Sequence, residues 1–166
     1  MIFNPVSLIV AVIIPFIIGF IYYHPKVMGT AWMRASNLTV SELEKSNMAV
    51  IFGCCALFNL LLAVQMHPIT IHQWGFFSTM ANHSAEMEQA GTAANQLFEQ
   101  FKPFMNEFRT YKHGAFHGLL TSIFLVLPVI GVNALFERKT WKYIGIHWLY
   151  WAIVLSATGA FICGWH

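Results

Sequence analysis

The sequence predicts an all-α integral membrane protein, a four-helix bundle with an additional amphipathic helix in the long connection between the second and third spans. Hydrophobic residues make up 57% of the 166 residues and charged residues only 10%, whereas an average soluble domain is about a quarter charged. The mean hydropathy is +0.59. Four windows of the length that a membrane helix needs contain no charged side chain. A chain this apolar cannot cover a water-facing surface, which excludes a soluble globule. A formal net charge of +2 is too small for a surface that tracks phosphates, which excludes a nucleic-acid partner.

The four spans form a single membrane domain that covers residues 1–166. We place the helices near residues 3–23, 46–66, 114–136 and 142–164. The first span lacks the basic start and the small-residue cleavage site of a secretory signal. Pro15 and Pro128 lie in the middle of the first and third spans. Because proline removes a backbone donor, we expect both helices to kink.

The start of the second helix has a clear sequence signature. Thr39 and Glu42 match a capping box, and Leu38 and Leu43 occupy the positions of a hydrophobic staple. The pattern predicts one continuous helix that begins in water near Val40 and enters the membrane around Asn47.

The distribution of Lys and Arg predicts the orientation. The short loops 24–45 and 137–142 hold six of the nine basic residues, and the connection 67–112 on the opposite side holds three. The positive-inside rule makes the short loops cytoplasmic. We therefore expect a multi-pass protein of the bacterial inner membrane with both termini on the outer, periplasmic side.

The connection 67–112 divides into two halves. The segment 68–81 is apolar and aromatic, and we expect it at the membrane interface. Apolar residues then recur at helical spacing and predict an amphipathic helix over about 84–108, capped by Ser84, weakened by Gly91 and bent by Pro103. This helix either lies on the outer membrane surface or serves as a lid or docking surface.

Small residues at four-residue steps predict how the spans pack. Helices in lipid associate by close approach of their backbones. The predicted packing residues are Gly114, Gly118 and Ser122 in the third span and Ala152, Ser156, Ala160 and Gly164 in the fourth. The stripes pack within one bundle, or one of them faces another copy or another subunit.

No known catalytic motif occurs in the sequence, and the spans contain no Asp, Glu, Lys or Arg. Intramembrane charges are typical of pumps and transporters. We predict no catalytic residue and consider an enzyme the less favoured class.

Histidine is the one unusual residue count, with eight in the chain, six of them on the predicted outer side. His113 and His117 are four residues apart, so both rings face the same way at the start of the third span. Two imidazoles on one helical face can hold Zn, Cu or haem iron if further ligands converge, and His83, Glu107 or His67 could supply them. The alternatives are interfacial hydrogen-bonding groups or a pH sensor. No cofactor is predicted outright.

A membrane-exit elbow follows the first span. Its residues are Tyr23, His24, Pro25, Gly29 and Trp32. Pro25 turns His24 away from helical geometry, and Gly29 permits a tight turn. The elbow has a structural role, or it brings Lys26 and Arg34 to lipid headgroups or a ligand.

The elbow residues also carry a resemblance. The order Gly19, Tyr23, Pro25, Gly29 and Trp32 resembles domain-of-unknown-function family 1761, and the run Leu135–Arg138 with the apolar last span ending in Trp165 is similar to the C-terminal half of that family. The resemblance implies a small four-span bacterial inner-membrane protein with no established activity. It implies no catalytic residues.

The expected function is therefore a non-enzymatic inner-membrane protein that self-associates or is an accessory subunit of a larger assembly, with its outer amphipathic segment as the interaction surface. Two alternatives remain: a metal- or haem-binding redox membrane protein that uses His113 and His117, and a carrier of a lipid or another apolar small molecule. The expected partners are the bilayer and a second membrane protein or a second copy.

Overall fold

The computed structural model describes residues 4–165, and every regular element in that range is a helix. Four helical stretches are long and apolar enough to cross a membrane. They are α1 (Pro5–Tyr22), α4 (Met48–Thr70), the stretch Tyr111–Phe136 and α10 (Trp141–Gly164). The prediction of a four-span all-α membrane fold is confirmed, with boundaries within a few residues of those expected.

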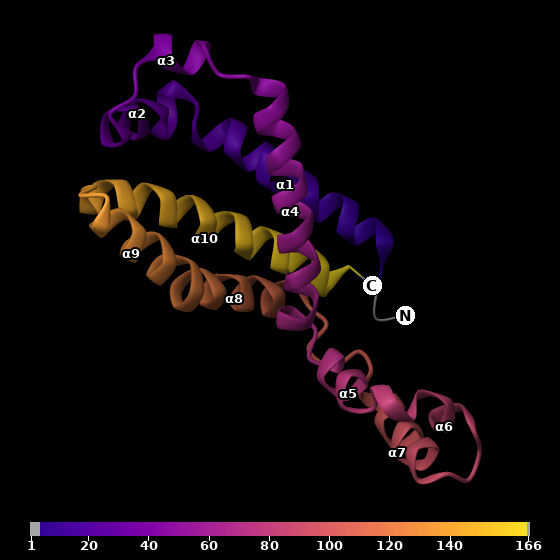
Figure 1. The fold of residues 1–166 in the computed structure, drawn as a ribbon. Coiled ribbons are helices and arrows are strands. Elements are labelled where there is room, and N and C mark those ends of the chain that lie inside the picture. Colours follow the sequence, from indigo (N-terminus) through magenta and orange to yellow (C-terminus); the bar gives the residue numbers. More distant parts are fainter. Residues whose placement is uncertain (1–3, 166) are drawn as a thin grey trace.

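Helix α10 lies at the centre of the bundle. It packs along the whole third span and also contacts α1 and α4 (Figure 1). Nine of its residues are buried, more than in any other described helix. The hydrophobic core forms where α10 meets α1 and α4. It includes Ala11 of α1, Ala63 and Met66 of α4, and Leu155 and Ile162 of α10.

The third span is one helical stretch with a widened turn in its middle. It consists of α8 (Tyr111–Thr121), the π turn η4 (Ser122–Val126) and α9 (Leu127–Phe136). The ring of Pro128 conflicts with the carbonyl group four residues earlier, at Phe124, and an extra residue in the turn relieves this conflict. Pro15, in contrast, lies inside an uninterrupted α1, where its carbonyl oxygen accepts a hydrogen bond from Tyr150 Oη at 3.0 Å.

The second span does not begin as predicted. The capping box is present, with Thr39 N donating to Glu42 Oε2 at 2.7 Å and Glu42 N donating to Thr39 Oγ1 at 3.3 Å. It starts only the short helix α3 (Val40–Glu44). A second cap, Asn47 Oδ1 accepting from Val50 N at 3.2 Å, starts α4. The expectation of one continuous helix from Val40 was wrong because Asn47 bonds the backbone locally and begins a new helix.

The connection between α4 and α8 folds into a helical hairpin rather than one long amphipathic helix. We call residues 73–104 the outer hairpin. Its elements are α5 (Gln73–Thr79), η2 (Ala81–His83), α6 (Ser84–Glu88), α7 (Ala93–Phe101) and η3 (Lys102–Phe104).

The predicted helix over 84–108 is interrupted at Gly91. This residue adopts a left-handed φ of 87°, and Thr92 Oγ1 then caps α7 by accepting from Asn95 N at 3.1 Å. The predicted cap at Ser84 was wrong, because Ser84 is the first residue of α6 and the cap position is His83, whose side chain makes no capping hydrogen bond. The outer hairpin projects away from the end of the bundle (Figure 1).

The two ends of the bundle differ in what they carry. The beginning of α1, the end of α10 and the base of the outer hairpin lie at one end (Figure 1). The opposite end carries η1 (Pro25–Gly29), α2 (Thr30–Ser36), α3 and the α9–α10 turn. The connection between the first and second spans and the connection between the third and fourth spans lie at this same end, as the sequence predicts.

Candidate metal centre

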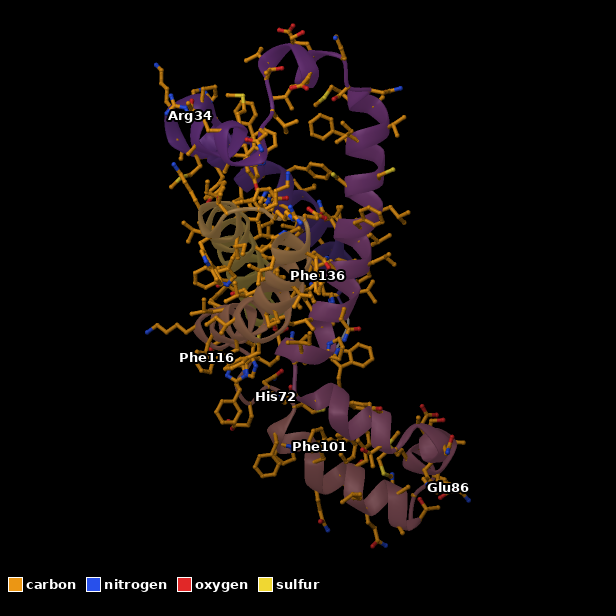
Figure 2. The ribbon with its side chains drawn as sticks, turned by 60° about the vertical axis from the view of Figure 1, so that its left-hand side comes forward. Arg34, His72, Glu86, Phe101, Phe116 and Phe136 are labelled. Carbon is orange, nitrogen blue, oxygen red and sulfur yellow. The ribbon has the colours of Figure 1, made fainter. Side chains whose placement is uncertain are left out.

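Three histidines converge where the outer hairpin leaves the bundle. His72 Nε2 lies 2.9 Å from His113 Nε2. The ring centroid of His117 is 4.8 Å from that of His72 and 4.5 Å from that of His113. The three residues offer ligand atoms that all lie within 4.8 Å of one another. We call His72, His113 and His117 the histidine triad, and Figure 2 shows its member His72 at the junction of bundle and hairpin.

The start of α8 places two of the three imidazoles. Thr110 Oγ1 accepts a hydrogen bond from His113 N at 3.2 Å and so begins the helix. The spacing of four residues puts His113 and His117 one above the other on the same face. Each is next in sequence to a buried glycine, Gly114 or Gly118, on the face that packs against α10. The imidazoles therefore lie at the rim of the packed face.

The third imidazole belongs to the junction between α4 and α5. His72 is exposed, but its neighbours Ile71 and Gln73 are only 1% and 4% exposed. Gln73 Nε2 donates hydrogen bonds to the carbonyl oxygens of Phe104 at 3.1 Å and Glu107 at 2.9 Å. Because buried residues hold the backbone on both sides, His72 is fixed in place beside α8.

A strained residue leads into α8 beside the triad. Phe108 has a left-handed φ of 60°, which is uncommon for a bulky side chain and costs on the order of 1–3 kcal/mol. Its ring centroid lies 5.3 Å from that of His113 and 6.4 Å from that of His72. On the other side, the Phe116 ring lies 5.9 Å from that of His117. Two aromatic rings therefore flank the triad.

The residue after this turn enters the bundle. Arg109 is 6% exposed, and its Nε donates to the carbonyl oxygen of Cys163 at 3.0 Å. Burial lowers the pKa of the guanidinium from its ordinary value. A cation at this place satisfies a free carbonyl at the C-terminal end of α10 and interacts favourably with the helix dipole.

The structure brings only part of the predicted ligand set together. His113 and His117 face one another, but His83 lies in the outer hairpin, with Nδ1 3.3 Å from Glu86 Oε2. Glu86 lies at the far tip of the hairpin (Figure 2). Glu107 is exposed, and its backbone oxygen, rather than its side chain, takes part in the junction.

His67, another predicted ligand candidate, is buried inside the bundle. Its Nδ1 lies 2.8 Å from the carbonyl oxygen of Ala63, and its Nε2 lies 3.5 Å from Ser7 Oγ. The ligand that sequence reasoning missed is His72. His72 follows the end of the second span, and His113 lies at the start of the third. Consecutive spans are joined at one end of the bundle, so the sequence already places both histidines at that end, and this signal could have identified His72.

The predicted packing residues of the third span lie against α10. A Cβ added at Gly114 would overlap the carbonyl oxygen of Gly159, and one added at Gly118 would overlap that of Leu155. Ser122 is fully buried and donates to the carbonyl oxygen of Leu119 at 2.7 Å. This is backbone-to-backbone packing of two helices.

Most of the predicted stripe of α10 lies beside the face that contacts α8. Ala152, Ser156 and Ala160 line a shallow depression together with Ala115 of α8, and Ala152 is also buried. Gly164 abuts the ring of Tyr111. The residues of α10 that face the two glycines of α8 are Leu155, Gly159 and Cys163, one position away from the predicted stripe.

The exit elbow forms a π turn at the opposite end of the bundle, where Figure 2 also shows Arg34. His24 Nδ1 accepts from Lys26 N at 3.2 Å. A Cβ on Gly29 would overlap the carbonyl oxygen of Tyr23. The Tyr23 ring lies 5.3 Å from that of Trp32. These contacts describe a tightly closed turn.

The histidine triad suits a borderline transition metal. Imidazole nitrogen is a ligand for Zn, Cu, Ni and Fe, and a tetrahedral zinc with bonds of about 2.0–2.1 Å places its ligand nitrogens about 3.3 Å apart. The hydrogen-bonded pair His72–His113 is slightly closer than this at 2.9 Å. A small outward rotation of either ring would bring the pair to metal-binding separation.

Comparison with known proteins identifies a family and no activity. No curated protein and no solved structure gave a match to the chain. A family model described as "Protein of unknown function (DUF1761)" matches residues 6–163, nearly the whole chain. With its four apolar helices, the chain belongs to this family of unknown function.

Proposed function

We propose that this membrane protein binds a divalent transition metal ion through His72, His113 and His117. The observation that carries the proposal is the convergence of three imidazoles from two separate parts of the chain, with ligand atoms within 4.8 Å of one another. A hydrogen bond between neutral rings accounts for the pair His72–His113. A shared metal ion would account for the convergence of all three imidazoles, because each supplies one ligand nitrogen.

The surroundings support the same proposal. The backbone at His72 is held between two buried residues, and the start of α8 is fixed by its Thr110 cap. Preorganised ligands lose little conformational freedom on binding. The strained Phe108 beside the triad is a further sign of function, since such strain persists where the surrounding structure demands it.

The test is metal binding by the purified, tag-free protein in detergent after removal of metal. We expect one Zn²⁺ or Co²⁺ per chain by calorimetry. Binding to the native state alone would raise stability by about 2.7 kcal/mol when the free ion is at 100 times its Kd. His117→Ala should reduce the affinity by at least tenfold, and His83→Ala, which removes an exposed histidine outside the triad, should leave it unchanged. Equal binding by both variants would contradict the proposal.

A second proposal concerns self-association, with a second copy of the chain as the partner. The supporting observation is the shallow depression on the outer face of α8 and α10. It is lined mainly by small residues, including Ala115, Ala152, Ser156 and Ala160. Small residues let a further helix approach closely in lipid. Ser156→Leu should lower the dimer fraction measured by single-molecule photobleaching in nanodiscs, whereas Gly131→Leu, on a face without close neighbours, should not.

We also propose that the triad faces outward in a bacterial inner membrane. The six basic residues of the two short connections lie at the opposite end, and the positive-inside rule makes that end cytoplasmic. A periplasm-active reporter fused after His166 should be active. Activity of a cytoplasm-only reporter at the same place would reverse the orientation.

A further inference from the structure

We infer that the metal centre keeps one coordination position open to water, and that this position takes an exchangeable small anion or hydroxide. The inference rests on the proposed metal binding by the histidine triad. A closed structural site lets the metal contribute only to stability, whereas a site with an open coordination position lets an exogenous ligand bind the ion.

The first step is the number of protein ligands. Structural zinc sites are closed by four protein ligands, whereas sites that bind water or substrate keep three and leave the fourth position free. Within residues 4–165, the group of potential ligands contains three histidines and no cysteine or carboxylate. The other histidines predicted as ligands are directed elsewhere, with His67 Nδ1 2.8 Å from the carbonyl oxygen of Ala63 and His83 Nδ1 3.3 Å from Glu86 Oε2.

The second step is access. His72 is exposed and the other two triad members are partly exposed. The flanking rings of Phe108 and Phe116 are 64% and 56% exposed, and a phenyl ring offers no ligand atom. The triad is therefore bordered by groups that can neither coordinate the ion nor bury it, so solvent reaches the remaining position.

The third step is charge. Three neutral imidazoles leave the full +2 on a divalent ion. Arg109 just before α8 and Lys112 in its first turn add positive charge, and the whole third span up to Phe136 contains no acid. The carboxylate of Glu107, on the segment before α8, is exposed to solvent. A net positive surrounding favours an anionic ligand, and a metal ion also lowers the pKa of a water molecule bound to it. The chemistry of the site therefore selects hydroxide or a small monodentate anion.

The experiment uses Co²⁺ as the metal and azide as the anion. Cobalt reports its coordination by visible absorption. We expect the spectrum of the one-to-one Co²⁺ protein to change saturably on titration with azide and to return on dialysis. If Co²⁺ binds at one per chain and its spectrum is the same with and without azide, the fourth position is closed. The inference then fails, whereas the proposed metal binding stands. If Co²⁺ does not bind, both the inference and the proposed function fail.

A pair of variants at one exposed position sharpens the test. Phe116→Glu places a carboxylate beside His117, where it can occupy the open position. We expect this change to raise the azide concentration needed for half-saturation by at least tenfold. Phe116→Ala should retain the azide response of the unaltered protein. Equal responses of the two variants would contradict an open position on this side of the triad.

Discussion

The bundle and the outer hairpin are both made of packed helices, but they are held together in different ways. In the bundle, α8 and α10 meet backbone to backbone, with Gly114 against Gly159. In the hairpin, α5 and α7 meet through large aromatic side chains. Phe76 stacks on Phe101 with ring centroids 4.0 Å apart and planes 5° from parallel.

The surroundings expected from the sequence explain this difference, because the spans are apolar enough for lipid whereas the hairpin carries the charged Glu86, Glu88, Glu99 and Lys102. In lipid, burying an apolar side chain gains little because lipid tails are apolar too, so close backbone approach supplies the attraction. In water, burying aromatic surface is itself the main driving force. The comparison teaches that one chain follows two packing rules according to what surrounds each part. The predictions below test each rule, from the largest effect to the smallest.

The largest effect should come from one methyl group at the α8–α10 contact. Gly118→Ala puts a Cβ into the carbonyl oxygen of Leu155, and the two helices must separate. We expect a loss of about 3 kcal/mol in the free energy of unfolding, the upper part of the usual range for overpacking. The measurement is the thermal unfolding midpoint in detergent.

The matched control lies in the same span. Gly131 has no atom within 4 Å of an added Cβ, so Gly131→Ala should stabilise the helix by up to about 1 kcal/mol through its better helix propensity. If both variants shift the midpoint in the same direction, close backbone packing does not hold α8 on α10.

A smaller, local effect should follow loss of an aromatic ring in the hairpin. Phe101→Ala removes the stack on Phe76 and its contact with Phe77. Because both partners are half-buried, we expect a local cost of about 2 kcal/mol, below the 3–5 kcal/mol of a fully buried phenylalanine. Limited proteolysis should cut residues 81–93 faster, while the melting of the bundle stays the same. Phe104→Ala, at an exposed ring, should change neither.

The smallest effect should come from the junction of the two regions. Gln73→Leu removes the amide that donates to the carbonyl oxygens of Phe104 and Glu107. Leaving these part-buried acceptors unpaired costs on the order of 1 kcal/mol. We expect faster amide exchange in the outer hairpin and unchanged exchange in α10. The exposed Gln96→Leu serves as control, and equal exchange in the two variants would show that Gln73 does not couple hairpin to bundle.

The features that the sequence predicted well depend on neighbours along the chain. The spans follow from length and the absence of charge, and the capping box from the spacing of Thr39 and Glu42. The pairing of His113 with His117 follows from helical spacing. The continuous helix from Val40 failed although its signals were local, because the second cap at Asn47 ends it early. Gly91 similarly broke the predicted helix over 84–108 by taking a left-handed conformation.

Other features depend on which helix faces which. The spacing of small residues in α10 gave a stripe through Ser156 and Ala160, yet the contact face runs through Leu155 and Gly159. Both stripes have the same period, so spacing cannot choose between them. Only the docking of α8 on α10 makes that choice.

By itself, the sequence determined four membrane helices, their ends to within a few residues and the presence of two histidines on one face, because hydropathy and helical period act within a segment. The tertiary structure decided that His72, 41 residues before His113, completes the triad. The physical reason is that the end of α4 and the start of α8 meet at the same end of the bundle, and no local rule measures the distance between two helices.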